Sequence, residues 1–134
     1  MQDIVICTSS EQDNRYIHQQ LRLYNRQFMR DFHDYHFHIQ LDGRIVAGIV
    51  AASTMDTLEV EFLFVEEAYR GRGLGQQLLE HVEKLARQDG LRRILLNTYS
   101  FQAPGFYQKL GYQQIAEIAP CFGDFCQYFF VREL

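Results

Sequence analysis

The stretch VEEAYRGRGLGQ, residues 65–76, joins a predicted strand to a predicted helix and decides the fold. Before it, residues 58–65 alternate so that Leu58, Val60 and Phe62 share one face of a strand. After it, apolar residues recur at helical spacing until a glycine, a residue that commonly follows a helix end. These positions are Leu74, Leu78, Leu79, Val82, Leu85 and Ala86, followed by Gly90. The sequence therefore predicts a strand, a glycine-rich turn and a long helix.

The turn combines Arg70 and Arg72 with glycines at positions 71, 73 and 75. Glycine tolerates positive φ and allows a ligand to approach the backbone closely. The first turn of a helix presents unpaired N–H groups and a partial positive charge. Together these features predict a binding site for a phosphate or pyrophosphate. The alternative is a glycine-rich surface turn with two solvated arginines.

The spacing of the glycines argues against two common nucleotide-binding motifs. The dinucleotide pattern GxGxxG would need a glycine where Gln76 stands, and the Walker pattern would need a Gly-Lys pair. The turn instead matches R-x-x-G-x-G, at Arg70, Gly73 and Gly75.

Further strands and helices are predicted on both sides of this unit. Toward the N-terminus we expect a strand at 4–6, a helix at 13–30, and strands at 37–41 and 44–53 around an Asp-Gly turn. Toward the C-terminus we expect a strand at 91–98, a short helix between Pro104 and Gly111, and strands at 112–118 and 126–131. This order predicts a mixed α/β layered domain.

Length and composition favour a single folded domain over residues 1–134. The 134 residues contain no linker, low-complexity segment or repeat, and 47% of them are hydrophobic, which argues against a disordered chain. With 13 Lys+Arg against 17 Asp+Glu, the net charge is −4. An acidic balance argues against a nucleic-acid partner bound by bulk phosphate attraction.

The cysteines and the apolar runs indicate a cytoplasmic protein. Cys7, Cys121 and Cys126 form no CxxC pair, which favours reduced thiols over a disulfide framework. The N-terminal residues lack a basic segment followed by an apolar run, so we expect no secretory signal. The longest nearly continuous apolar stretch, residues 45–52, is far shorter than the roughly 20 residues that cross a bilayer, so no membrane partner is expected.

Two sequence blocks together resemble the GCN5-related N-acetyltransferase (GNAT) family. The first is the R-x-x-G-x-G turn, and the second is APGFYQKLGY at residues 103–112, which is similar to the family pattern A-x-x-(L/F)-Y-x-K-L-G-(F/Y). The resemblance implies a central, mostly antiparallel sheet of about six to seven strands flanked by helices. It also implies that the fourth strand is bulged and splayed from the fifth, and that acetyl-CoA is the co-substrate.

The resemblance also implies which residues contact acetyl-CoA. Backbone groups of the strand would hydrogen-bond the pantetheine arm, and the turn would cradle the pyrophosphate. Many family members have an asparagine where Ser100 stands, so the contact made at this position is open. The implied cofactor-binding residues are Leu63, Phe64, Val65, Arg70, Gly71, Arg72, Gly73, Leu74, Gly75, Gln76 and Ser100.

By the same resemblance, Tyr107 is the general acid, and Glu59 or Glu61 is the general base. A phenol with a pKa of about 10 is protonated at neutral pH and can protonate a departing thiolate. A carboxylate with a raised pKa can accept the amine proton. We rank Glu59 ahead of Glu61. The alternatives are a packed helical aromatic for Tyr107 and solvent-facing strand carboxylates for the two glutamates.

Two other groups of residues are candidate sites. His33, His36 and His38 span a predicted helix end and a strand, and a zinc site needs about four converging ligands, so we expect no metal. In the family, the segment corresponding to residues 28–38 commonly borders the acceptor pocket; packing on the sheet is the alternative. Nothing in the sequence supplies Cys121 or Cys126 with a base, which favours direct transfer in a ternary complex.

The predicted function is N-acetyl transfer from acetyl-CoA to a primary amine of a small molecule or peptide. A non-catalytic acyl-CoA-binding module is the alternative, because it would need the arginine–glycine turn but not Tyr107. A toxin that acetylates aminoacyl-tRNA is disfavoured by the acidic balance. A homodimer is possible, since dimers are common in the family and Phe129, Phe130 and Val131 could form a strand-mediated interface.

Overall fold

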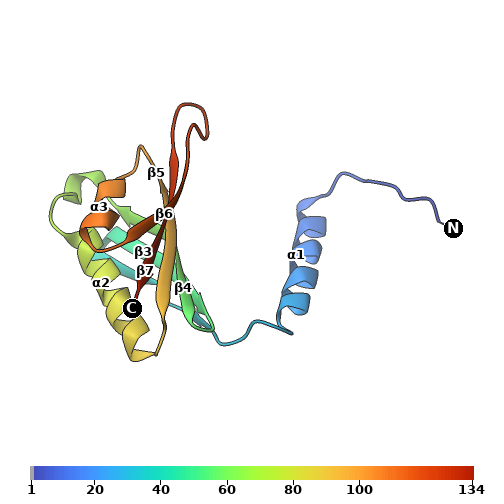
Figure 1. Ribbon diagram of the computed structural model, residues 1–134, viewed down its shortest axis with the longest axis horizontal. Coiled ribbons are helices and arrows are strands. Elements are labelled where there is room, and N and C mark those ends of the chain that lie inside the picture. Colours follow the sequence, from blue (N-terminus) through green and yellow to red (C-terminus); the bar gives the residue numbers. More distant parts are fainter. Residues whose placement is uncertain (1) are drawn as a thin grey trace. The chain divides into compact units, whose positions relative to one another are not determined.

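The computed structural model describes residues 2–134, which form two compact units, one ending at Arg30 and the other spanning Asp31–Leu134. The first unit contains helix α1 (Glu11–Asn25) (Figure 1). The Ser10 hydroxyl accepts the Asp13 N–H at 3.2 Å, and the Asp13 carboxylate accepts the Ser10 N–H at 2.9 Å. This reciprocal capping box starts the helix. The predicted helix at 13–30 is therefore present, but it starts two residues earlier and ends at Asn25.

The strand predicted at residues 4–6 is wrong. Ile4, Val5 and Ile6 have no regular secondary structure, and their side chains are exposed. Three β-branched residues favour an extended backbone locally, but a strand is stabilised by a hydrogen-bonded neighbour. Among the described strands, none pairs with this segment.

The second unit is built on a seven-stranded sheet, as the predicted fold class requires. Its strands are β1 (Phe32–Asp34), β2 (Phe37–Leu41), β3 (Arg44–Thr54), β4 (Thr57–Val65), β5 (Arg93–Tyr99), β6 (Gln113–Ile118) and β7 (Gln127–Glu133). The spatial order is β1-β3-β4-β5-β7-β6, with β2 also beside β3. β4 and β5 pair in parallel, whereas the other neighbours are antiparallel. The short strand β1 was not predicted.

Helix α2 (Leu74–Gln88) covers one face of the sheet and forms the core with it (Figure 1). Leu79 and Val82 are fully buried, as are Leu58 on β4 and Ile94 on β5. A short 3-10 helix, η1 (Glu67–Tyr69), precedes α2, and α3 (Pro104–Lys109) follows β5. The strand–turn–helix unit predicted from the sequence is therefore confirmed.

A β-bulge interrupts β4 at Glu61. On β3, Val50 is opposite Phe62, but the next residue, Ala51, is opposite Val60, so Glu61 is the extra residue. A bulge reverses the side-chain alternation beyond it. The prediction that Phe62 shares the face of Leu58 is therefore wrong: Phe62 is 68% exposed and Leu58 is fully buried.

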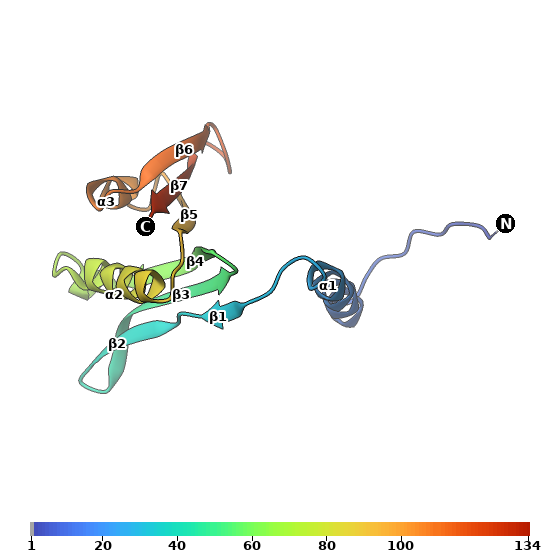
Figure 2. The ribbon, with the colours of Figure 1, turned by 60° about the horizontal axis from the view of Figure 1, so that its bottom comes forward.

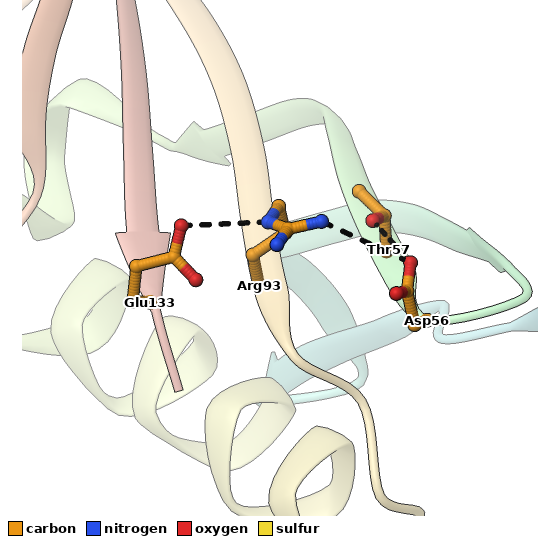
Figure 3. A network of polar contacts seen from close by, with 4 residues as sticks. All are labelled: Asp56, Thr57, Arg93 and Glu133. Carbon is orange, nitrogen blue, oxygen red and sulfur yellow. Dashed lines mark hydrogen bonds and ion pairs between the residues drawn. The ribbon is translucent and has the colours of Figure 1, made fainter.

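β4 and β5 separate after a short paired segment. Their pairing runs from Thr57 opposite Arg93 to Glu59 opposite Leu95 and then stops, which confirms the expected splay. Arg93 lies at the paired end, 3.4 Å from Glu133 and 4.0 Å from Asp56 (Figure 3). Where the two strands separate, β5 lies in one group with β6, β7 and α3, and this group lies beside α2 and strands β2 to β4 (Figure 2). Ion pairs of Arg93 thus connect the strands at the end where β4 and β5 pair, whereas the carboxyl ends of β4 and β5 are separated.

Candidate active site

A cavity of about 1050 Å³ lies where β4 and β5 separate. Its walls come from the carboxyl ends of both strands, the turn before α2, and α3 with the loop that precedes it. The lining residues are Glu61–Val65 of β4, Tyr69, Arg70, Gly71, Gly73–Gln76, Asn97–Tyr99 of β5, Phe101, Gln102, Ala103, Phe106 and Tyr107. Both motif blocks singled out in the sequence therefore contribute to one cavity.

The turn before α2 has the backbone that its glycines permit. Gly71 and Gly73 have φ values of 79° and 76°, in the left-handed region that favours glycine. Gly73 is the N-cap of α2, and in the described part of the chain no side chain caps this end of the helix. The first N–H groups of α2 thus face the cavity that Gly73, Leu74, Gly75 and Gln76 line.

Gly75 allows the turn to pack closely against its neighbours. A Cβ at this position would lie 3.4 Å from the Val65 Cγ2 atom and 3.6 Å from the Phe106 ring. A larger side chain would therefore fill the space beside the uncapped helix end.

The two arginines of the turn have different surroundings. Arg70 lines the cavity, and its Nε donates to the Val65 carbonyl at 3.0 Å, which fixes the guanidinium across the turn. Arg72 does not line the cavity; its guanidinium lies 5.0 Å from the centre of the Tyr69 ring. The structure thus brings Arg70 to the cavity directly and Arg72 only to its rim.

Tyr107, on α3, lines the cavity and packs against other aromatic rings. Its ring centre lies 5.1 Å from Phe106, 5.8 Å from Phe130 and 5.9 Å from Tyr112. The Tyr107 carbonyl accepts the Tyr112 N–H at 3.0 Å. Burial raises the pKa of Tyr107 above its ordinary value, so the phenol stays protonated at neutral pH.

The bulge decides which glutamate reaches the cavity. Both glutamates are exposed, but Glu61 lines the cavity, whereas Glu59 lies on the part of β4 that still pairs with β5. Among the described residues that line the cavity, Glu61 is the only one with a carboxylate. Glu59, which was ranked first in the sequence analysis, does not line the cavity, whereas Glu61 does.

Ser100 joins two loops and does not line the cavity. Its N–H donates to the Cys126 carbonyl at 2.9 Å, and its hydroxyl accepts the Cys126 N–H at 3.0 Å. Ser100 therefore ties the end of β5 to the connection between β6 and β7. Nearby, the Gln102 side chain accepts from the Thr98 hydroxyl at 2.8 Å and from the Tyr99 N–H at 3.0 Å.

Sequence reasoning missed several cavity residues. Asn97, Thr98 and Tyr99 line it because they end the strand that diverges from β4, and Phe101 follows them. The sequence signal for these residues is the succession of two strand–helix units, β4–α2 and β5–α3. Such units favour parallel strands, whose carboxyl ends lie at the same sheet edge, so the end of β5 is expected beside the end of β4.

The histidines do not converge. His36 Nδ1 accepts the Ala51 N–H at 3.3 Å, and its Nε2 lies 3.5 Å from Asp34. His33 is on β1 and His38 on β2. The described residues contain no group of three or more His, Cys, Asp or Glu that could hold a metal ion. Among the described helices, none is long and apolar enough to cross a membrane.

Comparison with known proteins identifies relatives over most of the chain. The model of the acetyltransferase (GNAT) family matches residues 2–112. A blasticidin-S acetyltransferase from Streptomyces morookaense is 36% identical over 93 residues, which are 69% of this chain and 68% of that protein. The crystal structure of an acetyltransferase from Bacillus cereus superposes with a TM-score of 0.86 at 30% identity, over 98% of both chains. An acetyltransferase from Bacillus anthracis, solved in complex with acetyl coenzyme A, superposes with a TM-score of 0.65 at 19% identity, over 74% of this chain and 61% of that chain.

Proposed function

The chain belongs to the acetyltransferase (GNAT) family, and from this premise we propose that it transfers the acetyl group of acetyl-CoA to a primary amine by direct attack in a ternary complex. One observation carries the proposal: a single cavity joins the uncapped glycine turn, the open edge of β4, the Tyr107 phenol and the Glu61 carboxylate. The similarity to a blasticidin-S acetyltransferase favours a small-molecule amine over a peptide. We also propose that both units belong to one acetyltransferase domain, because the family match runs from residue 2 to residue 112.

The residues present fit acetyl-CoA, which supplies an activated thioester when bound. The N–H groups of Gly73–Gln76 at the start of α2, together with Arg70, would hold its pyrophosphate. Arg72 would act from the rim. Beyond Glu59, β4 has no β5 partner, so backbone groups of Leu63, Phe64 and Val65 would hydrogen-bond the pantetheine arm. Ser100 would act indirectly, by holding the loop wall.

Two side chains would move the protons that acetyl transfer requires. A C–N bond forms as the C–S bond breaks, the amine loses one proton, and the sulfur gains one. Glu61 would accept the amine proton, directly or through water, because it is the carboxylate in the cavity. Tyr107 would donate the proton to the sulfur, because burial keeps the phenol protonated. The products are then an amide and free coenzyme A.

The test is release of free thiol from acetyl-CoA with a panel of amines. We expect Tyr107→Phe to lower kcat by about 100-fold, the scale of general acid catalysis, with little change in the KM for acetyl-CoA. Tyr24→Phe, which removes the hydroxyl of an exposed tyrosine on α1, is the matched control. An unchanged kcat for Tyr107→Phe would show that Tyr107 is not the general acid. Acetyl-CoA binding without turnover of any amine would instead favour a non-catalytic binding module.

A further inference from the structure

Four aromatic rings form a connected cluster at the wall of the cavity. The Tyr99 and Phe101 rings stack at 5.4 Å between centres with an interplanar angle of 5°. Phe122 contacts Tyr99 edge-on at 5.5 Å, and Phe125 contacts Phe101 edge-on at 4.8 Å. Tyr99 and Phe101 line the cavity, so the cluster extends the cavity wall from the end of β5 onto the β6–β7 connection.

Hydrogen bonds fix the two segments that carry these rings. The paired bonds between Ser100 and Cys126 connect the segments, and the Cys121 N–H donates to the Phe125 carbonyl at 2.7 Å. Phe122 has a φ of 56°, a left-handed conformation that is costly for a bulky residue and that surrounding contacts must maintain. The cluster is therefore a defined surface and not a collapsed loop.

Three of the four rings remain exposed despite these contacts, and Tyr99 is half-buried. Phe101 is 63%, Phe122 68% and Phe125 45% exposed. Contiguous exposed aromatic surface beside a cavity is typical of a ligand-binding surface, because burial of these rings in a complex is favourable. The same cavity contains the Glu61 carboxylate, which would attract a protonated amine before the proton is removed.

We propose that the aromatic cluster of Tyr99, Phe101, Phe122 and Phe125 binds a flat, apolar ring of the acceptor, so that the substrate class is primary amines attached to aromatic or heteroaromatic groups. This inference rests on the proposed function and specifies its acceptor. Stacked and edge-on rings select for planarity as well as for apolar area. The proposal therefore predicts discrimination between two amines that share a carbon skeleton, one with a flat aromatic ring and one with a puckered saturated ring.

Phenethylamine and 2-cyclohexylethylamine form such a pair, because they share one carbon skeleton and a primary amine. We expect kcat/KM to be about 10-fold higher for phenethylamine. Phe101→Leu and Phe122→Leu keep apolar side chains but remove the rings, and each should reduce this ratio by about 2- to 10-fold while the KM for acetyl-CoA is unchanged. Ile115→Ala, an exposed apolar position on β6, is the control and should keep the ratio.

Other outcomes would overturn the assignment. Equal kcat/KM for the two amines, or a ratio that survives both Leu substitutions, would show that the cluster does not recognise the acceptor ring. A raised KM for acetyl-CoA in the Leu variants would show that the rings contact the cofactor. A change in their oligomeric state on gel filtration would show that the rings lie in a subunit interface. Calorimetry of both amines with coenzyme A present tests the ring preference without turnover. Failure of the proposed function, with no thiol release from any amine, is thereby distinguished from failure of this inference.

Discussion

Replacement of Glu83 tests whether a buried ion pair holds the wall that carries Tyr107. Glu83, on α2, is 6% exposed, and its carboxylate accepts the Tyr112 hydroxyl at 2.8 Å. The Arg132 Nε atom on β7 lies 3.8 Å from the same carboxylate, and Arg132 Nη1 donates to the Leu110 carbonyl at 2.7 Å. This network joins α2 to the end of α3.

The expected loss of stability of Glu83→Ala follows from the two groups that lose their partner, the Tyr112 hydroxyl and the Arg132 guanidinium. Glu83→Ala leaves the Tyr112 hydroxyl without its acceptor and the Arg132 guanidinium without its counter-charge. Removal of one member of a buried pair costs about 3–5 kcal/mol. The Arg132 side chain is 26% exposed, so water reaches part of it, and we expect about 3 kcal/mol. Glu83→Gln keeps an acceptor for Tyr112 and should cost less, about 1–2 kcal/mol.

Urea unfolding at pH 7 measures this loss. For an m-value of about 2 kcal/mol/M, a loss of about 3 kcal/mol lowers the midpoint by about 1.5 M. Glu80→Ala, which removes an exposed carboxylate from the same helix, is the control and should shift the midpoint far less. If Glu83→Ala costs under about 1 kcal/mol, or no more than Glu83→Gln, the pairing argument is refuted.

Three further predictions concern the cavity. Arg70→Ala should weaken acetyl-CoA binding by about 10-fold or more in calorimetry, because an ionic hydrogen bond to phosphate is lost; equal affinity would remove Arg70 from the site. Glu61→Gln should lower kcat/KM more than Glu59→Gln does, because only Glu61 lines the cavity; the reverse order would restore Glu59 as the base. Burial raises the pKa of Tyr107, so the ratio of parent to Tyr107→Phe kcat should stay constant from pH 7 to pH 9, and a decline within that range would contradict a protonated donor.

The parts of the site that depend on local chemistry could be predicted from the sequence. Glycine at 71 and 73 is required wherever the backbone takes positive φ, and both residues do so. Leucines at helical spacing after the turn placed α2 correctly, because its buried face packs on the sheet. The position of Tyr107 was also predictable, because the motif that contains it forms α3, and α3 lines the cavity.

Features that depend on a distant partner could not be predicted. The apolar residues 4–6 suggested a strand, but strand formation is decided by the neighbour that pairs with it. Ser100 was expected at the cofactor, and its actual partner, Cys126, lies 26 positions away. The aromatic cluster likewise assembles from rings on separate segments, so no window of sequence contains it.

The bulge in β4 shows how one pairing detail decides which glutamate lines the cavity. A regular strand would put Glu59 and Glu61 on one face and leave the choice between them open. Val50 and Ala51 of β3 pair with Phe62 and Val60, which leaves Glu61 as the extra residue. This register depends on both strands. Since the strands separate beyond Glu59, the bulged Glu61 lines the cavity and Glu59 does not. If Glu61 is the base, its position therefore depends on the β3 register, and a change that removes the bulge should impair turnover while every cavity side chain is retained.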